Sequence, residues 1–374
     1  MKRLFAGLLV AVGLVTSAMA CYNDSDTSLT ELRDNLDVMK AVSGRFTLYP
    51  DAYYEKRIEI QSAILKKDPN NLDAYDNISV AYDRIGKGDE ALRLIREKRK
   101  HLANAPTLQL YSTEANEGTF LIVRWIRGHK PGDLTDALES EKHIALALKI
   151  NPNAHFGREF AQLACIHAMI QCGKDVGWEL KFADTLVTVA DHDHLDRHKL
   201  RYGIAGMMVL GAAWQMPSMI QAIAKLVPEE EQVVALCASR LRNFKNLLHE
   251  EKRGKSVIDS FPVPDHSGVQ YADQHYIYQE IIRGAERFQV HRQEWIAQQL
   301  AQGKHTDNDP DFWKGFKDEG EIDPKDLTRA TWWTPYRRIL EDIVLPGLII
   351  GAILALPGYL VFRGIRGAIK RIRP

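Results

Sequence analysis

The densest group of side chains that could perform chemistry lies in the stretch DHDHLDRHK, residues 191–199. If this stretch is helical, His194 and His198 share a face, and Asp191 could join them as the third ligand of a zinc ion in a metal-dependent hydrolase. The spacing fits no established ligand pattern, and a hydrated turn between two helices explains the same composition. We therefore expect a turn with no metal or other cofactor, and the hydrolase stays the alternative function. The cluster comprises Asp191, His192, Asp193, His194, Asp196 and His198.

Other catalytic patterns in the chain are incomplete. The HEEKR stretch at His249 lacks the second histidine that a metalloprotease helix carries one turn later. No G-x-S-x-G nucleophile elbow occurs. Glu141 and His143 could suggest acid–base work, but on an amphipathic helix they are more typical of a solvated face. The sequence thus predicts no catalytic residue and a protein that is not an enzyme.

Residues 66–100 show how the chain organises its polar and apolar positions. Two apolar stripes at helical spacing flank a glycine turn, Gly86 to Gly88, where glycine tolerates the left-handed conformation of a helix end. Asp89 is a candidate cap for the second helix. Neither helix can bury its stripe alone, so neighbouring pairs must cover it. The expected core positions are Tyr75, Ile78, Ser79, Tyr82, Ala91 and Ile95.

This helix pair resembles the tetratricopeptide repeat, with its pattern of Trp-x2-Leu-Gly-x2-Tyr followed by Ala-x3-Phe. The first part corresponds to Tyr75-x2-Ile78-Ser79-x2-Tyr82, and the second to Ala91-x3-Ile95. A weaker second unit has its first helix at about residues 108–126 and ends at Pro152. Lys98 departs from the pattern, because the family usually has alanine there.

The resemblance implies an all-α fold, a helical-repeat solenoid over residues 21–185. Residues 186–303 form a further helical region, with a long helix from about Tyr271 to Gln302 that ends at Gly303. Residues 304–343 are polar, rich in Asp, Gly and Pro, and are expected to be a linker. The number of true repeats stays open.

First helices line the inner, concave face of such repeats, and this resemblance assigns a peptide-binding role to five residues of the opening unit. The group is net acidic, so we expect a basic or mixed peptide or protein partner. These residues are Asn71, Asp73, Asp76, Asp83 and Arg84.

The two ends of the chain carry targeting signals. Residues 1–20 combine a basic start, an apolar stretch and a small-residue cleavage site, as in a secretory signal peptide. Cys21 follows the cut, and its lipidation stays open. Residues 344–362 are apolar and long enough to cross a bilayer once, and the basic tail 363–374 is typical of the cytoplasmic side. The bulk of the chain is then periplasmic, anchored in the inner membrane of a bacterium.

Charge and cysteine usage narrow the choice of partners further. Lys+Arg and Asp+Glu are both 49, so no net field favours nucleic acid. Cys165 and Cys172 are too far apart along one helix to pair with each other. Buried free thiols are expected at Cys165, Cys172 and Cys237, and a disulfide between Cys237 and either of the other two stays open. Gly347 and Gly351 form a G-x3-G pair in the span, which leaves a homodimer open. Taken together, the sequence predicts a non-enzymatic, membrane-anchored protein-binding scaffold of the cell envelope.

Overall fold

The computed structural model describes residues 38–152, 157–211, 213, 216–228, 233–234, 236–242 and 269–318. The chain divides into two compact units, of which the first comprises Met1–His266 and Tyr278–Glu321. The second comprises Ser267–Ile277 and Ile322–Pro374, and includes the beginning of the last helix.

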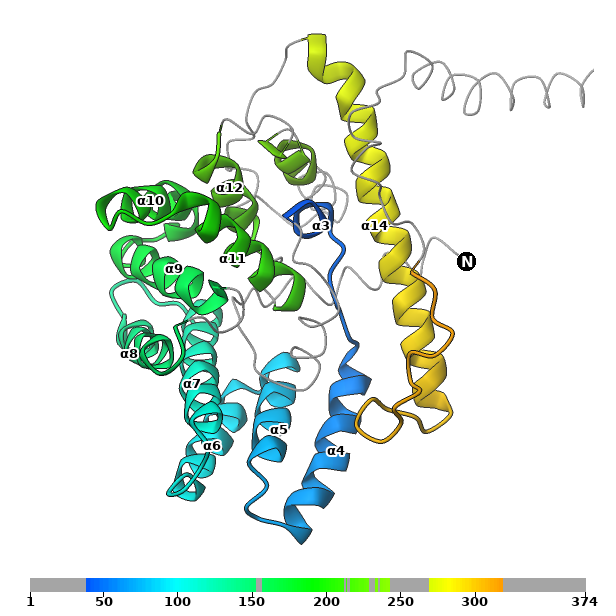
Figure 1. Ribbon diagram of the computed structural model, residues 1–374. Coiled ribbons are helices and arrows are strands. Elements are labelled where there is room, and N and C mark those ends of the chain that lie inside the picture. The colour runs from blue at the N-terminus through cyan, green and yellow to red at the C-terminus, as the bar shows by residue number, and fades with distance from the viewer. Residues whose placement is uncertain are drawn as a thin grey trace, which may run out of the picture. The chain divides into compact units, whose positions relative to one another are not determined.

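All regular elements of the described residues are helices (Figure 1), as the all-α prediction requires. They are α3 (Val38–Ser43), α4 (Asp51–Lys67), α5 (Leu72–Arg84), α6 (Gly88–Lys98), η1 (Arg99–His101), α7 (Thr107–Arg127), α8 (Thr135–Ile150), α9 (Arg158–Cys172), α10 (Trp178–His192), α11 (Arg197–Leu210), α12 (Pro217–Leu226) and α14 (Val269–Ala301). The helices expected at about residues 108–126 and 271–302 correspond to α7 and α14.

Local signals explain how the α5–α6 pair begins and ends. Asn71 caps α5, its side-chain oxygen accepting a hydrogen bond of 3.0 Å from the Ala74 backbone N–H. The turn after α5 contains Gly86 with φ +80°, which glycine adopts without strain. The expectation for Asp89 was wrong: the N-cap residue of α6 is Lys87, and Asp89 lies inside the first turn. Its carboxylate accepts a hydrogen bond from Arg124 of α7 instead.

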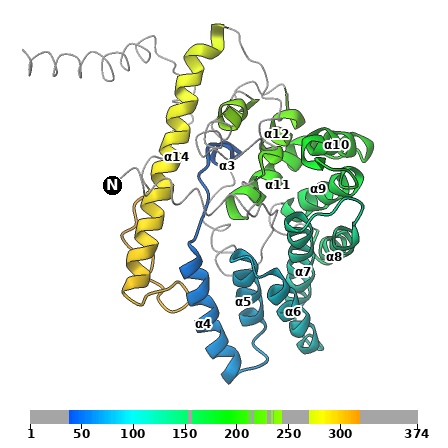
Figure 2. The same ribbon diagram turned by 180° about the vertical axis from the view of Figure 1, so that it is seen from behind.

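The helices from α4 to α10 pack in chain order, each against the next (Figures 1 and 2). Helices two positions apart also meet, in the pairs α5 with α7, α9 with α11 and α10 with α12. Glycines permit two of the close approaches. A Cβ added at Gly118 of α7 would lie 2.8 Å from Ile144 of α8, and one at Gly203 of α11 would lie 2.4 Å from the Ala161 Cβ of α9.

Helix α11 also reaches back to the start of the array, which distinguishes the fold from a simple open solenoid. It packs against α3, and the Val209 carbonyl accepts hydrogen bonds from both the backbone N–H and the hydroxyl of Thr47. The Leu210 carbonyl accepts another from Arg84 at the end of α5. Contacts between segments this distant in sequence cover faces that an open array would expose.

The expected core positions of the α5–α6 pair are mostly buried. Tyr75, Ile78, Ser79, Ala91 and Ile95 are all at most 6 % exposed, and Tyr82 is partly buried. Ala91 and Ile95 pack with Phe120 and Leu121 of α7, so the second helix of the pair buries its stripe against the next helix. The free cysteines Cys165, Cys172 and Cys237 are buried, in agreement with the sequence analysis.

Residues 304–318 are not the unpacked linker that their polar composition suggested. Asp307, with its side chain 3 % exposed, pairs with the fully buried Arg57 of α4 at 2.8 Å. The His305 ring packs against Tyr53 in a tilted arrangement with 4.1 Å between centroids, and Phe312 is 1 % exposed. Polar residues in this segment supply a buried ion pair and ring contacts. Composition alone cannot distinguish such a packed segment from a solvated linker.

The predicted targeting segments lie outside the described residues. These are the signal peptide 1–20, Cys21, the span 344–362 with its glycine pair, and the tail 363–374. Within the part of the chain that the structure describes, no helix combines the length and the apolar character that crossing a membrane requires.

Candidate functional site

The five residues assigned to a binding face occupy different environments. Asp73 is exposed and accepts a hydrogen bond of 2.6 Å from Gln109 of α7. Asn71 caps α5, and Arg84 is held by the Leu210 carbonyl. Asp76 and Asp83 are 5 % and 0 % exposed, so the expectation that they lie on an open surface was wrong.

Each buried aspartate of α5 has a cationic partner from a neighbouring helix. Asp83 accepts a hydrogen bond of 3.0 Å from Arg127 of α7. Asp76 Oδ2 lies 2.6 Å from Lys98 Nζ, and this lysine side chain at the end of α6 is 0 % exposed. Where the tetratricopeptide pattern has alanine, Lys98 supplies the cation that the buried Asp76 carboxylate needs. The sequence shows this lysine but not its partner on α5.

The Asp76–Lys98 pair is completed by neutral donors. Ser112 Oγ donates to Asp76 Oδ2 over 3.0 Å, and Asn116 Nδ2 donates to Oδ1 over 3.1 Å. Burial raises the pKa of Asp76, while Lys98 and the other donors act in the opposite direction. Burial has the opposite effect on Lys98 and lowers its pKa, because it disfavours the charged form of either group. Desolvation has the largest effect on both pKa values, so the surrounding hydrogen bonds and the ion pair offset only part of the cost of burying the two charges.

Polar side chains continue from this pair across two further helices. Asn116 and Thr119 are three positions apart on α7 and so share a face. The Thr119 hydroxyl accepts a hydrogen bond of 3.0 Å from Gln162 Nε2 of α9, and Glu159 lies three positions before Gln162. We call this set the inner polar stripe; it comprises Asp76, Asn116, Thr119, Gln162 and Glu159. All of its members are at most 5 % exposed, and they come from α5, α7 and α9.

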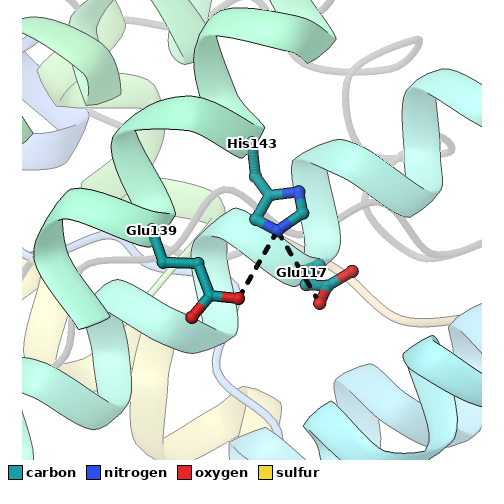
Figure 3. Close-up of side chains that lie close together, drawn as sticks. All are labelled: Glu117, Glu139 and His143. Carbon is teal, nitrogen blue, oxygen red and sulfur yellow. Dashed lines mark ion pairs between the residues drawn. The ribbon is translucent and has the colours of Figure 1, made fainter. Parts of the chain in front are cut away.

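A second group of charges joins α6, η1, α7 and α8. We call it the α6–α8 charge network; it comprises Arg96, Arg99, Glu114, Glu117, Glu139 and His143. Figure 3 shows His143 of α8 between two carboxylates, with its Nε2 3.7 Å from Glu117 and 4.0 Å from Glu139. Its Nδ1 lies 2.6 Å from Glu114 Oε2. The solvated face expected for His143 is thus wrong, since three glutamates surround the ring.

Two arginines already neutralise most of this network. Glu117 accepts hydrogen bonds of 2.8 Å from both Arg96 and Arg99, one to each carboxylate oxygen. Three carboxylates and two guanidiniums leave one negative charge, which a protonated His143 would cancel. Burial opposes the ionisation of Glu114, but hydrogen bonds from His143 and Arg99 outweigh it and lower its pKa to about 2.

One atom from each of Glu117, Glu139 and His143 lies within 4.8 Å of the others, a grouping that could hold a metal ion. A cation there would compete with the guanidiniums that already bond the two carboxylates. The donor set therefore fits a structural ion-pair network better than a metal centre.

The His/Asp stretch is a turn between α10 and α11. Asp196 caps α11 by accepting a 3.0 Å hydrogen bond from the Lys199 backbone N–H, and His194 lies in the left-handed region with φ 52°. His194 and His198 therefore do not lie on one helix, as a zinc site required. Asp191 bonds Arg197, and within the described residues this turn is not among the groupings that could hold a metal.

Comparisons with known proteins add no family to these observations. No protein-family model, no curated protein and no solved structure matches the chain.

Proposed function

We propose that this protein is a non-enzymatic scaffold of the bacterial cell envelope, a tetratricopeptide-like helical array that binds a protein or peptide partner. One predicted C-terminal span, residues 344–362, holds the array to the inner membrane, and the predicted signal peptide places it in the periplasm. Single-pass anchoring keeps the binding domain close to its partner at the membrane.

The packing order of α5 to α12 is the observation that carries the proposal. Consecutive helices meet from α5 to α10 and again at α11 with α12, and α5 meets α7, α9 meets α11 and α10 meets α12. Contacts of both kinds are what stacked two-helix units produce. In that arrangement α5, α7, α9 and α11 are first helices, and three of them supply the inner polar stripe. The charge networks support the same reading, because their groups bond one another and thereby fix the helices.

Reporter fusions test the tether and its direction. Alkaline phosphatase fused after Gly303 should be active, because it folds only outside the cytoplasm. Green fluorescent protein fused after Pro374 should fluoresce, because it does so only on the cytoplasmic side. An inactive phosphatase fusion, or a silent fluorescent fusion of normal abundance, would contradict the proposed orientation.

Exposed positions are the right ones for testing the binding face. Reversing a charge at Asp76 or Asp83 would break a buried ion pair and so disturb the fold. Asp73→Lys changes an exposed charge next to the stripe, and should weaken capture of the partner from the native envelope without changing helical content. Unchanged capture by this variant would move the binding face away from the N-terminal end of α5.

A further inference from the structure

The buried carboxylates of the described residues follow one rule with one exception. Asp76, Asp83, Glu114 and Glu117 are each at most 6 % exposed, and each has a lysine or arginine nitrogen within 3.0 Å. Such pairing is expected, because an ionised carboxylate that loses water needs an opposite charge and hydrogen-bond donors. Glu159 of α9 does not follow the rule.

Glu159 is 1 % exposed, and neither of its carboxylate oxygens has a hydrogen-bond partner. The ion pair recorded for it runs from Oε1 to Arg158 Nη2 over 4.0 Å, too long for a hydrogen bond. One turn further along α9, Gln162 is 0 % exposed, and its Oε1 also lacks a donor. The 3.0 Å bond from Gln162 Nε2 to Thr119 fixes the amide and leaves that acceptor oxygen available.

Three acceptor atoms without donors thus lie on one face of α9, at the end of the inner polar stripe. The opposite end of the stripe shows how this interior satisfies a carboxylate. There Lys98 supplies an ammonium group 2.6 Å from Asp76 Oδ2, and neutral side chains supply further donors. At Glu159 no group donates to the carboxylate, and the guanidinium nearest to it in the described ion pairs, that of Arg158, stays 4.0 Å away.

We propose that Glu159 and Gln162 form a binding position for a basic side chain of the partner polypeptide, with arginine preferred. A guanidinium can donate to both oxygens of a carboxylate and has further N–H groups for Gln162 Oε1. The inference rests on the proposed function, and it specifies the partner: a segment with a basic residue that inserts between α7 and α9. Glu159 is almost fully covered, so binding requires a local opening of the array.

Thermal unfolding of the full chain with small ligands tests the position directly. The probes are Nα-acetyl-arginine amide and Nα-acetyl-lysine amide at tens of millimolar, with the citrulline analogue as an uncharged control of the same shape. Ligand at about ten times its Kd should raise Tm by a few degrees. The arginine probe should give the larger rise, and citrulline none.

Two variants, Glu159→Gln and Glu179→Gln, distinguish ligand binding at Glu159 from a general effect of removing a negative charge. Both glutamates occupy the second position of a helix, α9 and α10 respectively, so both changes remove the same charge from a helix N-terminus. Glu159→Gln should abolish the rise in Tm, and Glu179→Gln should keep it. Gln162→Leu should reduce it, and circular dichroism verifies that each variant is folded.

Several outcomes would overturn the assignment. The first is that neither basic probe raises Tm, and the second is that Glu159→Gln shows the same rise in Tm as the wild type. The third is that MgCl2 or CaCl2 raises Tm in a way that depends on Glu159, while the basic probes do not raise it. Partner crosslinking separates this inference from the proposed function. If the wild type crosslinks a partner and Glu159→Gln does so equally, the binding position is wrong and the scaffold stands. If no partner is crosslinked at all, the scaffold fails, and the Tm experiment still decides the site.

Discussion

Replacing Lys98 with alanine tests whether the interior depends on paired charges. Alanine is the usual residue at this position of the tetratricopeptide repeat, which the α5–α6 helix pair resembles. From that pattern alone, the substitution should change the free energy of unfolding little. The structure predicts a large loss, because Lys98 Nζ lies 2.6 Å from Asp76 and both side chains are at most 7 % exposed. Removing one member of a buried ion pair costs about 3 to 5 kcal/mol, since the other charge stays buried without its partner.

Urea unfolding of the full chain, followed by far-ultraviolet circular dichroism, measures this loss. The double variant Asp76→Asn with Lys98→Met should recover most of the free energy of unfolding, because it buries no unpaired charge. Lys100→Ala is the matched control: that lysine is 69 % exposed, and water screens its pair with Glu97, so this variant should unfold at the same urea concentration as the wild type. A Lys98→Ala variant within about 0.5 kcal/mol of the wild type would refute the reasoning.

Three further predictions concern the helix contacts and the buried groups. The pKa of Glu114 falls from 4.5 to about 2 on folding, so the stability that this carboxylate contributes is present above pH 4.5 and is lost as the pH falls toward 2. Over that pH range the free energy of unfolding of the wild type, measured in urea, should fall by about 3 kcal/mol more than that of Glu114→Gln. Parallel pH curves of the two proteins would contradict the network. Gly203→Ala should lower the free energy of unfolding by about 1 to 3 kcal/mol through the clash between α11 and α9, whereas Gly88→Ala, with 3.7 Å to its nearest neighbour, should be neutral or stabilising. Burial raises the pKa values of the Cys165 and Cys237 thiols, so both should resist alkylation in the native protein and react in urea; labelling in the native state, read by mass spectrometry, would contradict their burial.

Much of the helical framework could be predicted because its signals are local. The glycine turn after α5, the long uninterrupted pattern of α14 and the apolar spacing of α7 each depend on neighbouring residues. Such signals survive in any tertiary context that leaves the helix intact. The cysteine expectation also held, because spacing along a helix is a geometric limit.

The site was harder to predict because its contacts join distant segments. The resemblance to a repeat assigned Asp76 and Asp83 to one binding face, but it did not reveal the cations of α6 and α7 that pair with them. The pairing of Arg57 with Asp307 joins residues 250 positions apart, so the polar segment after α14 looked like a linker. A sequence does not show whether a charged side chain is solvated by water or paired with a residue of another helix. The one usable signal was Lys98, a charge where the repeat pattern has a small apolar residue.

In vivo photo-crosslinking most directly tests the central claim that the inner side of the array binds a protein. A photo-reactive residue is placed in the full chain at exposed positions of first helices, Asp73 of α5 and Tyr202 of α11, and of second helices, Glu90 of α6 and Lys142 of α8. We expect a discrete protein adduct in the membrane fraction from the first-helix positions and none from the second-helix positions. Adducts from the second-helix positions alone, equal adducts from all four, or none from any would contradict it.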